Sequence, residues 1–323
     1  MSAAIAVQPE RVLKDLQQLW AQMAREQAES GGVLRACAMT LVVAAEDAAD
    51  AERVRQTVGV LMHNHPSRAV ILRPRGESGS SAVLDARIFA ECWKPFGKAQ
   101  QICSEGIEIT AGQGGFSEVA KFLVPLRVPD LPAVLWCRGA AALEPGPLES
   151  LFTLADKIIF DSSNAPDADS ALQFLRRLRG RGRRVADLHW TRLTGWREVL
   201  SHLFDDEALE AAEIKAAQVK FGGPSVTTCA RYFSAWIRTA LPAARVTIES
   251  SGREDGPPGL SSVTLSTASD NLTIARGSDH NVEVSGCGRH YRSLLPSASE
   301  EALMQEELGI LGPDPVYERA LSA

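Results

Sequence analysis

Six arginines stand within nine residues near the middle of the chain, with two glycines between them. Guanidinium groups bind phosphates and carboxylates through paired hydrogen bonds, so this arginine run could hold a phosphate, a nucleic acid or the acidic surface of a protein. It could equally be a solvated helix end, where cations complement the negative pole of the helix. Both interpretations stay open for the residues of the run, Arg176, Arg177, Arg179, Arg181, Arg183 and Arg184.

The segment Asp187–Arg197 interleaves two tryptophans with arginines and a histidine at an expected helix start. Tryptophan and arginine are enriched at the centres of protein interfaces, so the segment could be a contact surface. The same side chains could instead anchor the core between two domains. The candidate partner-binding residues are His189, Trp190, Arg192, Trp196 and Arg197.

A weaker candidate for anion binding lies earlier in the chain. Gly112, Gly114 and Gly115 follow an expected strand and precede an expected helix, where backbone amides can cradle a phosphate. Arg68, at the start of another strand, could anchor a carboxylate at the sheet edge. A plain helix start also explains the glycines, and we favour that interpretation.

Catalytic and metal signatures are missing from the sequence. It has no GxGxxG, GxxxxGK[ST], GxSxG or HExxH pattern, and its six cysteines show no zinc-ligand spacing. We therefore predict no catalytic residue, no metal and no cofactor.

The elements that must position these residues alternate between two patterns over the first 200 residues. Continuous apolar runs predict strands buried on both faces at residues 36–45, 68–73, 133–137, 157–160 and 185–188. Apolar residues at helical spacing predict helices at residues 9–30, 47–63, 117–126, 148–155, 169–179 and 190–204. This order is typical of an open, mostly parallel α/β sheet.

Residues 84–110 differ because their apolar side chains alternate, as in an antiparallel hairpin around Lys94–Gly97. A symmetric hairpin places opposite each other the residues whose numbers sum to 195, which gives the pairs Arg87 with Glu108, Ile88 with Ile107 and Cys92 with Cys103. The first two pairs are chemically sensible cross-strand neighbours. The register therefore predicts adjacent thiols at Cys92 and Cys103, a candidate redox pair.

The patterns predict two domains. The first, residues 1–204, is the α/β domain with its antiparallel hairpin. The second, residues 205–323, is predicted to be a smaller α+β domain, with linker helices over about 205–224, a further helix over 225–240, an antiparallel meander over 245–285 and a closing helix over 299–311.

Composition narrows the function classes. The chain of 323 residues carries a formal charge of −6, which argues against a dedicated nucleic-acid binder. No apolar stretch approaches the roughly 18 residues of a membrane span, and the N-terminus lacks a signal-peptide pattern. We expect a cytoplasmic protein that binds no membrane.

Four ordered blocks give the sequence its resemblance to a known family. They are Asn64–Ile71, Val124–Trp136, Ala155–Ser162 and Asp187–Arg197, the last reading DLHWTRLTGWR. Together they resemble the glucose-6-phosphate dehydrogenase assembly protein (OpcA) family over about the first two thirds of the chain. The pattern departs from the family at Trp136-Cys137, where two adjacent tryptophans are expected.

The resemblance implies a non-catalytic protein that binds glucose-6-phosphate dehydrogenase and promotes its oligomerisation or activity in the oxidative pentose phosphate pathway. It also implies thioredoxin as a candidate partner, although no regulatory cysteine can be matched residue by residue. The alternative is an enzyme that binds a phosphate ligand on the α/β domain through Arg68 and the Gly112–Gly115 loop.

Overall fold

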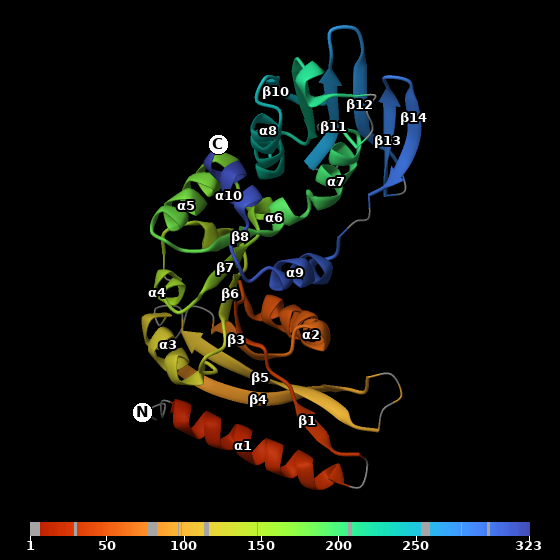
Figure 1. Cartoon of the computed structure of the whole chain (residues 1–323). Coiled ribbons are helices and arrows are strands. Elements are labelled where there is room, and N and C mark those ends of the chain that lie inside the picture. Colours follow the sequence, from red (N-terminus) through yellow and green to blue (C-terminus); the bar gives the residue numbers. More distant parts are fainter. Residues whose placement is uncertain are drawn as a thin grey trace. The chain divides into compact units, whose positions relative to one another are not determined.

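A computed structural model describes the chain except for residues 1–6, 29–30, 76–82, 96, 98, 113–115, 147, 206–208, 253–258, 279 and 296–297. The chain folds into two compact units, each built from more than one segment (Figure 1). Unit 1 contains residues 1–160, 181–185 and 304–311, and unit 2 contains residues 161–180, 186–303 and 312–323. The sequence-based division at residue 204 does not coincide with these units.

A sheet of eight strands supplies the strands of unit 1, and its last strand, β8, has only Val185 in that unit. Seven strands follow the order β1-β5-β3-β2-β6-β7-β8, and β4 pairs with β5. The strands are β1 (Val33–Arg35), β2 (Met39–Ala44), β3 (Ser67–Arg75), β4 (Val83–Trp93), β5 (Gln101–Gly112), β6 (Ala133–Cys137), β7 (Lys157–Phe160) and β8 (Val185–Asp187). The pairs from β1 to β7 are parallel and β4 is antiparallel to β5, which confirms the predicted fold class.

The central strands of this sheet are apolar because they are covered on both faces. Every residue of β2, β6 and β7 is buried, the pattern expected for parallel strands between two layers. The helices of this region are α1 (Pro9–Glu26), α2 (Ala48–Asn64), α3 (Phe116–Leu123) and α4 (Glu149–Phe152). The Asp47 side chain caps α2 by accepting a hydrogen bond from the Asp50 amide at 2.6 Å.

The hairpin register agrees with the sequence prediction. In β4 and β5, Arg87 lies opposite Glu108, Ile88 opposite Ile107 and Cys92 opposite Cys103. Helix α1 contacts β4 and buries Val12 and Leu16.

A buried lysine joins distant parts of the sequence within unit 1. Lys157 of β7 is 5% exposed, and its ammonium group donates to the Glu307 carboxylate at 2.6 Å and to the main-chain carbonyls of Glu307 and Ile310, each at 2.7 Å. Glu307 belongs to helix α9 (Glu300–Gly309). Three oxygen acceptors thus compensate a charge that burial alone would make costly.

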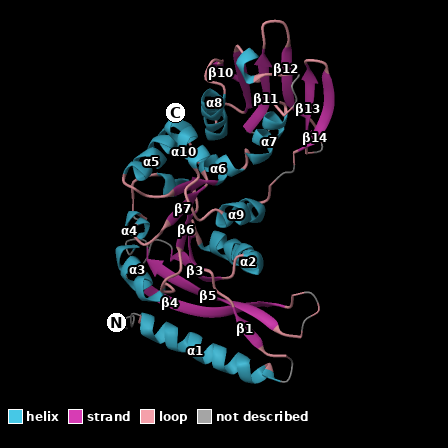
Figure 2. Cartoon of the chain, in the orientation of Figure 1, coloured by secondary structure: helices cyan, strands magenta, loops and turns pink. Residues whose placement is uncertain are grey.

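Unit 2 contains a second sheet, of six strands in the order β10-β9-β11-β12-β13-β14 (Figure 2). They are β9 (Ala216–Gly222), β10 (Arg245–Ser250), β11 (Gly259–Ser266), β12 (Asn271–Arg276), β13 (Asn281–Gly286) and β14 (Arg289–Leu294). The helices of unit 2 are α5 (Ala168–Gly180), α6 (Leu188–Thr191), α7 (Thr194–His202), α8 (Thr228–Ala240) and α10 (Pro315–Ser322). The helix predicted over 225–240 is therefore present and begins at Thr228.

The predicted linker helices over about residues 205–224 are wrong at residues 216–222, and residues 206–208 lie outside the described residues. Ala217, Val219 and Phe221 alternate with polar residues and are buried, so the segment forms strand β9 between β10 and β11. Its alanines and glutamates favour a helix only before Ile214, where a short 3-10 turn spans Ala211–Glu213. The period of two outweighs this local preference because it buries one face of the strand.

The predicted meander is also wrong at both ends. Strand β10 pairs in parallel with β9, and α8 connects the two strands as a crossover helix. The antiparallel meander consists of β11 to β14 and ends at Leu294. The closing region has two helices, α9 and α10, and the predicted helix over 190–204 divides into α6 and α7.

Candidate functional site

The aspartate at the end of β8 organises the tryptophan-arginine segment inside unit 2. Asp187 is fully buried and accepts hydrogen bonds from the Ser162 and His189 amides, each at 2.9 Å, and from the Tyr232 hydroxyl at 2.8 Å. Burial raises the pKa of Asp187 to about 6, although these donors oppose the shift. Asp187 also caps helix α6, so it fixes where the helix begins.

A second aspartate lies close to Asp187 and holds an arginine. Asp161 binds Arg192 through both carboxylate oxygens, each at 2.7 Å. Burial raises the pKa of Asp161, but the hydrogen bonds and charge of Arg192 outweigh it and lower the pKa to about 2. The negative charge of Asp161 contributes to the raised pKa of Asp187. The environment of unit 2 thus separates the pKa values of two neighbouring carboxylates.

Both candidate tryptophans lie in the core of unit 2, each 2% exposed. The ring of Trp190 packs against Tyr232 and Tyr317, with centroids 5.8 and 5.7 Å apart, and the Arg197 guanidinium lies 3.9 Å from its centroid. The ring of Trp196 lies near Phe233, with Arg276 5.7 Å from its centroid. The tryptophans therefore hold α6, α7, α8 and α10 together, and their faces are not available to a partner.

His189 joins a chain of buried polar groups. Its Nδ1 atom is hydrogen-bonded to the Thr228 hydroxyl, which lies 2.7 Å from the Ser162 hydroxyl. A cavity of about 160 Å³ opens beside these residues and is lined also by residues 222–227 of the loop into α8. His189 is only 8% exposed, so its side chain is part of the interior of unit 2.

The thiol of Cys229 lies beside this chain of polar groups. Burial raises its pKa, but the electrostatic effect of His189, the hydrogen bonds of His189 and Thr227 and the positive charge of Arg276 outweigh burial and lower it. The side chain is 3% exposed. The thiol with the lowered pKa is therefore shielded from solvent.

The first half of the arginine run belongs to helix α5 of unit 2. Arg176 donates through Nε to the Leu321 carbonyl, and Arg179 donates to the Ser322 hydroxyl and pairs with Glu318 at 3.1 Å. These contacts attach α10 to α5. Arg177 is exposed, with its guanidinium 5.9 Å from the ring centroid of Phe174.

The second half of the arginine run belongs to unit 1. The Arg181 side chain is 66% exposed and lies 3.9 Å from the Glu149 carboxylate, at the limit of an ion pair. Arg184 is exposed and lies 3.4 Å from the Leu311 carbonyl, and Arg183 is half-buried. Exposed positive charge within the run is therefore found at Arg176, Arg177, Arg181 and Arg184.

Arg68 does anchor a carboxylate, but the carboxylate belongs to the chain itself. Its Nε atom donates to Glu105 at 2.6 Å and one Nη atom donates to the Leu126 carbonyl at 2.9 Å. Glu105 also accepts hydrogen bonds from Arg35 and from the Trp20 indole. Burial raises the pKa of Glu105, but Trp20 and the two arginines outweigh it and lower the pKa. The guanidinium group of Arg68 is thus already paired, which argues against its predicted role in holding a phosphate.

The other part of the predicted anion site is incompletely described. Gly112 ends strand β5, whereas Gly114 and Gly115 lie outside the described residues. Within the described part of the chain, no group of three or more His, Cys, Asp or Glu side chains is arranged to hold a metal ion. None of the described helices is long and apolar enough to cross a membrane.

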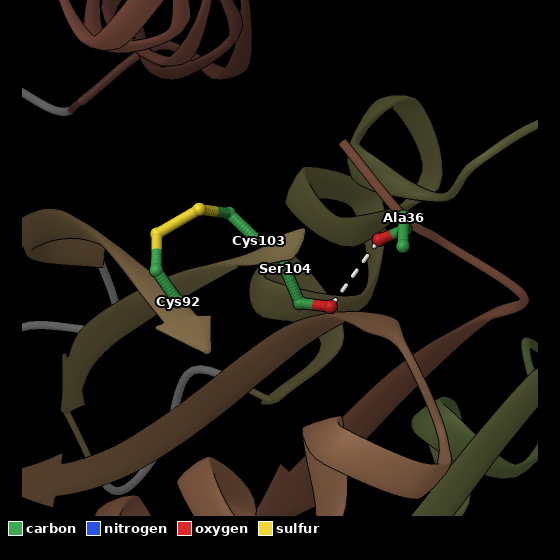
Figure 3. The surroundings of a disulfide bond; sticks show 4 residues. All are labelled: Ala36, Cys92, Cys103 and Ser104. Atoms are coloured by element: carbon green, nitrogen blue, oxygen red, sulfur yellow. Dashed lines mark hydrogen bonds between the residues drawn. A yellow bond between two sulfur atoms is a disulfide. The ribbon is translucent and has the colours of Figure 1, made fainter. Parts of the chain in front are cut away.

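The candidate redox pair forms a disulfide between β4 and β5 (Figure 3). The Cα atoms of Cys92 and Cys103 are 4.1 Å apart, as expected for directly opposed residues of an antiparallel pair. Cys103 is fully buried and Cys92 is half-buried. Beside the disulfide, the Ser104 hydroxyl donates to the Ala36 carbonyl at 3.2 Å.

Sequence reasoning missed the acidic members of these networks, namely Glu105, Asp161, Asp187 and Glu307. Two of them left a signal, because Asp161 stands directly after a predicted strand, Asp187 stands near the end of another, and both lie inside the blocks that carry the family resemblance. Acidic residues at strand ends next to apolar runs need a partner if buried, and Arg192 supplies one for Asp161.

Comparison with known proteins matches the chain to two family models in succession. The first describes the N-terminal domain of a glucose-6-phosphate dehydrogenase subunit and matches residues 58–177. The second describes the C-terminal domain of the same protein and matches residues 183–321. Similar curated proteins are the putative OxPP cycle protein OpcA of Synechocystis, 30% identical over 145 residues, and that of Nostoc punctiforme, 27% identical over 184 residues.

These relatives are longer proteins. The aligned region covers 44% of this chain and 30% of the Synechocystis protein, and 55% of this chain and 38% of the Nostoc protein. The chain thus matches about a third of the length of each curated relative.

Solved structures with a similar arrangement are NADP-binding oxidoreductases. KijD10, a 3-ketoreductase from Actinomadura kijaniata, gives a TM-score of 0.49 at 11% identity, covering 88% of this chain and 93% of that chain. Biliverdin reductase from Synechocystis gives 0.48 at 10% identity, covering 88% and 96%. At this level of similarity, the activities of these enzymes are not carried over to this chain.

Proposed function

Since the chain belongs to the OpcA family of glucose-6-phosphate dehydrogenase assembly proteins, we propose that it binds a glucose-6-phosphate dehydrogenase as a non-catalytic partner and promotes its assembly or activity in the oxidative pentose phosphate pathway. The observation that carries this proposal is the ordered match of both family models, which together extend from residue 58 to residue 321. The absence of known catalytic motifs from the sequence agrees with it.

Such an activator acts by differential affinity. It must bind the active or assembled form of the dehydrogenase more tightly than the inactive form, because equal affinity for both forms shifts no equilibrium. A tenfold shift toward the active form requires a difference of about 1.4 kcal/mol in binding free energy. A few well-placed contacts are sufficient for this difference.

Exposed arginines are the candidate contacts. In unit 1 they are Arg181 and Arg184, with half-buried Arg183 between them, and in unit 2 the candidate is Arg177. Guanidinium groups of this kind bind an acidic protein surface through carboxylate pairs. Arg176 and Arg179 support the surface instead, because their donors are bonded to α10.

The tryptophan-arginine segment has a positioning role in this proposal. His189, Trp190 and Trp196 are buried. Arg192 is hydrogen-bonded to Asp161, and Arg197 stacks on Trp190. These residues fix the helices of unit 2 on which exposed side chains stand. Their substitution is expected to alter stability first and dehydrogenase binding as a consequence.

The test is a charge reversal in the arginine run of the full chain. The triple variant Arg181→Glu, Arg183→Glu and Arg184→Glu is expected to weaken binding to the cognate dehydrogenase at least about tenfold, because each acidic side chain would repel an acidic partner surface. Binding is measured by co-purification and by titration of dehydrogenase activity at a fixed enzyme concentration.

A matched control reverses three exposed charges on α1, namely Arg11→Glu, Lys14→Glu and Arg25→Glu. This control changes the net charge by the same amount. If the wild-type chain neither binds nor activates the dehydrogenase, the proposed function is wrong. If both triple variants lose affinity equally, the arginine run is not the contact surface.

A thermal-shift screen distinguishes the proposed function from the alternative, an enzyme that binds a phosphate ligand. Stabilisation of the chain by sugar phosphates or nucleotides, without any effect on the dehydrogenase, would support a phosphate-ligand enzyme instead.

A further inference from the structure

One face of the six-stranded sheet in unit 2 is open. In the four inner strands, the apolar side chains on the other face are almost fully buried, among them Val219 in β9, Val263 in β11 and Val284 in β13, and helix α8 packs against β9, β10 and β11. Alternate residues of the same strands point to the opposite face, and these are half-buried or exposed. A sheet with one covered face and one polar face can bind another sheet without unfolding.

Two rows of side chains cross the open face from β10 to β14. The strand registers align the first row as Glu249, Lys220, Ser262, Ala275, Glu283 and Arg292. They align the second row as Thr247, Gln218, Thr264, Thr273, Ser285 and His290. The face is therefore small and hydroxyl-bearing in the middle, and charged at both edges.

The order of charge along the first row is its informative property. From β10 to β14 the row reads negative, positive, neutral, neutral, negative, positive. A two-fold axis that runs along the strands between β11 and β12 reverses this order in a second copy. Glu249 then faces Arg292 of the second copy, and Lys220 faces Glu283 of the second copy. Every charge meets its opposite, and each pair occurs twice.

The second row is equally compatible with the same axis. Thr264 and Thr273 exchange places next to the axis, and their hydroxyls are already 3.0 Å apart within one sheet. Gln218 faces Ser285 of the second copy, so donors meet acceptors along the row. No like charges are brought together by this operation in either row.

Contacts within the sheet hold the charges in place. The Glu283 carboxylate pairs with Arg292 at 2.7 Å, and the Gln218 amide donates to Glu249 at 2.9 Å. In a face-to-face pair, each of these groups gains a second partner and becomes part of a network. Networks contribute more than the isolated surface pairs of a monomer.

We propose that this open face joins two copies of the chain in a two-fold dimer. Six strands spaced about 4.8 Å apart and about six residues long present roughly 600 Å² for each copy. The pair of faces therefore covers about 1,200 Å², at the lower limit of a specific interface. The proposal concerns the chain itself and does not depend on the proposed function.

The test measures the oligomeric state of the full chain by light scattering and sedimentation equilibrium over a range of protein concentration and salt. We expect a concentration-dependent dimer that weakens as salt increases. Glu249→Arg and Arg292→Glu, made singly, each place two like-charge pairs in the dimer and should weaken it about 10- to 100-fold. The double variant should restore the dimer, because the exchanged charges again meet opposites.

The rescue is diagnostic because of where the two residues lie. Glu249 is in β10 and Arg292 is in β14, at opposite edges of one sheet of six strands. Their separation within one chain is about 24 Å, too far for direct contact, so rescue requires a second copy. Lys220→Glu and Glu283→Lys provide an independent pair for the same experiment.

Arg238→Glu is the control, because Arg238 is exposed on α8, on the covered side of the sheet, and should leave the dimer unchanged. A chain that stays monomeric up to about 100 μM contradicts the proposal, as does a double variant no better than its single parents. Loss of dehydrogenase binding by a monomeric chain with these substitutions would assign the face to that partner instead.

Discussion

Arg192 binds Asp161 through two parallel hydrogen bonds, each 2.7 Å long. The pair connects the residue that follows β7 with the end of helix α6. Because the interaction is bidentate, a lysine at position 192 keeps the charge but loses the paired geometry.

We expect Arg192→Lys to lower the free energy of unfolding by about 1–2 kcal/mol. Urea denaturation at pH 7 measures the loss, and Arg238→Lys on exposed α8 is the matched control. An unchanged midpoint would show that the second hydrogen bond contributes nothing. The pKa of Asp161 is lowered to about 2, so this stabilisation is present above pH 4 and is lost as the pH falls through 2.

The pKa of Asp187 is shifted in the opposite direction to that of Asp161. Burial raises its pKa from 3.8 to about 6, so the folded chain binds a proton more tightly than the unfolded chain between these values. Its contribution to stability is therefore complete below about pH 4 and is lost as the pH rises through 6. Asp187→Asn removes this titration but keeps an oxygen acceptor.

The difference in unfolding free energy, wild type minus Asp187→Asn, should increase by up to about 3 kcal/mol as the pH falls from 7 to 4. Urea midpoints at each pH unit measure it. A difference that stays constant over this range would mean that Asp187 has an ordinary pKa.

A substitution at Trp190 distinguishes a role in core packing from a role in partner contact. Replacing it with phenylalanine keeps a ring against Tyr232 and Tyr317 but shrinks the face beneath Arg197, and we expect a loss of about 1–3 kcal/mol in stability. Affinity for the dehydrogenase, measured well below the melting temperature, should change less than twofold. Loss of affinity at unchanged stability would instead make Trp190 a contact residue.

The Cys92–Cys103 disulfide closes a short loop in unit 1. Cys92→Ala with Cys103→Ala should destabilise the chain by about 3 kcal/mol relative to the oxidised wild type. Reduction of the wild type should give a similar loss, and thioredoxin should accelerate it by attacking the half-buried Cys92 sulfur. Mass mapping that finds both thiols free after mild oxidation would exclude the bond, and Cys37→Ala serves as the control.

The sequence predicted those elements whose local pattern agrees with their burial. β2, β6 and β7 are apolar throughout, and the hairpin alternates about its turn, so both the sheet type and the pairing of Cys92 with Cys103 followed from the residues alone. Strand β9 was missed because alanine and glutamate before it favour a helix, and only three alternating residues indicate a strand.

The candidate site was less accessible to sequence reasoning. Tryptophan and arginine are frequent both in interfaces and in cores, and only the observed burial of Trp190 and Trp196 distinguishes the two. The partners of Arg68 and Arg192, namely Glu105 and Asp161, come from distant parts of the sequence, so their ion pairs depend on tertiary structure.

The three hydrogen bonds of Lys157 affect how the chain folds during its synthesis. Its acceptors lie at Glu307 and Ile310. About 150 further residues must therefore be synthesised after strand β7 before the ammonium group of Lys157 is compensated. Unit 1 therefore reaches its final state only after residues 304–311 have been synthesised. A shortened gene that stops at residue 204 would leave this charge buried and unmatched, and its product is expected to be a substrate for chaperones and proteases.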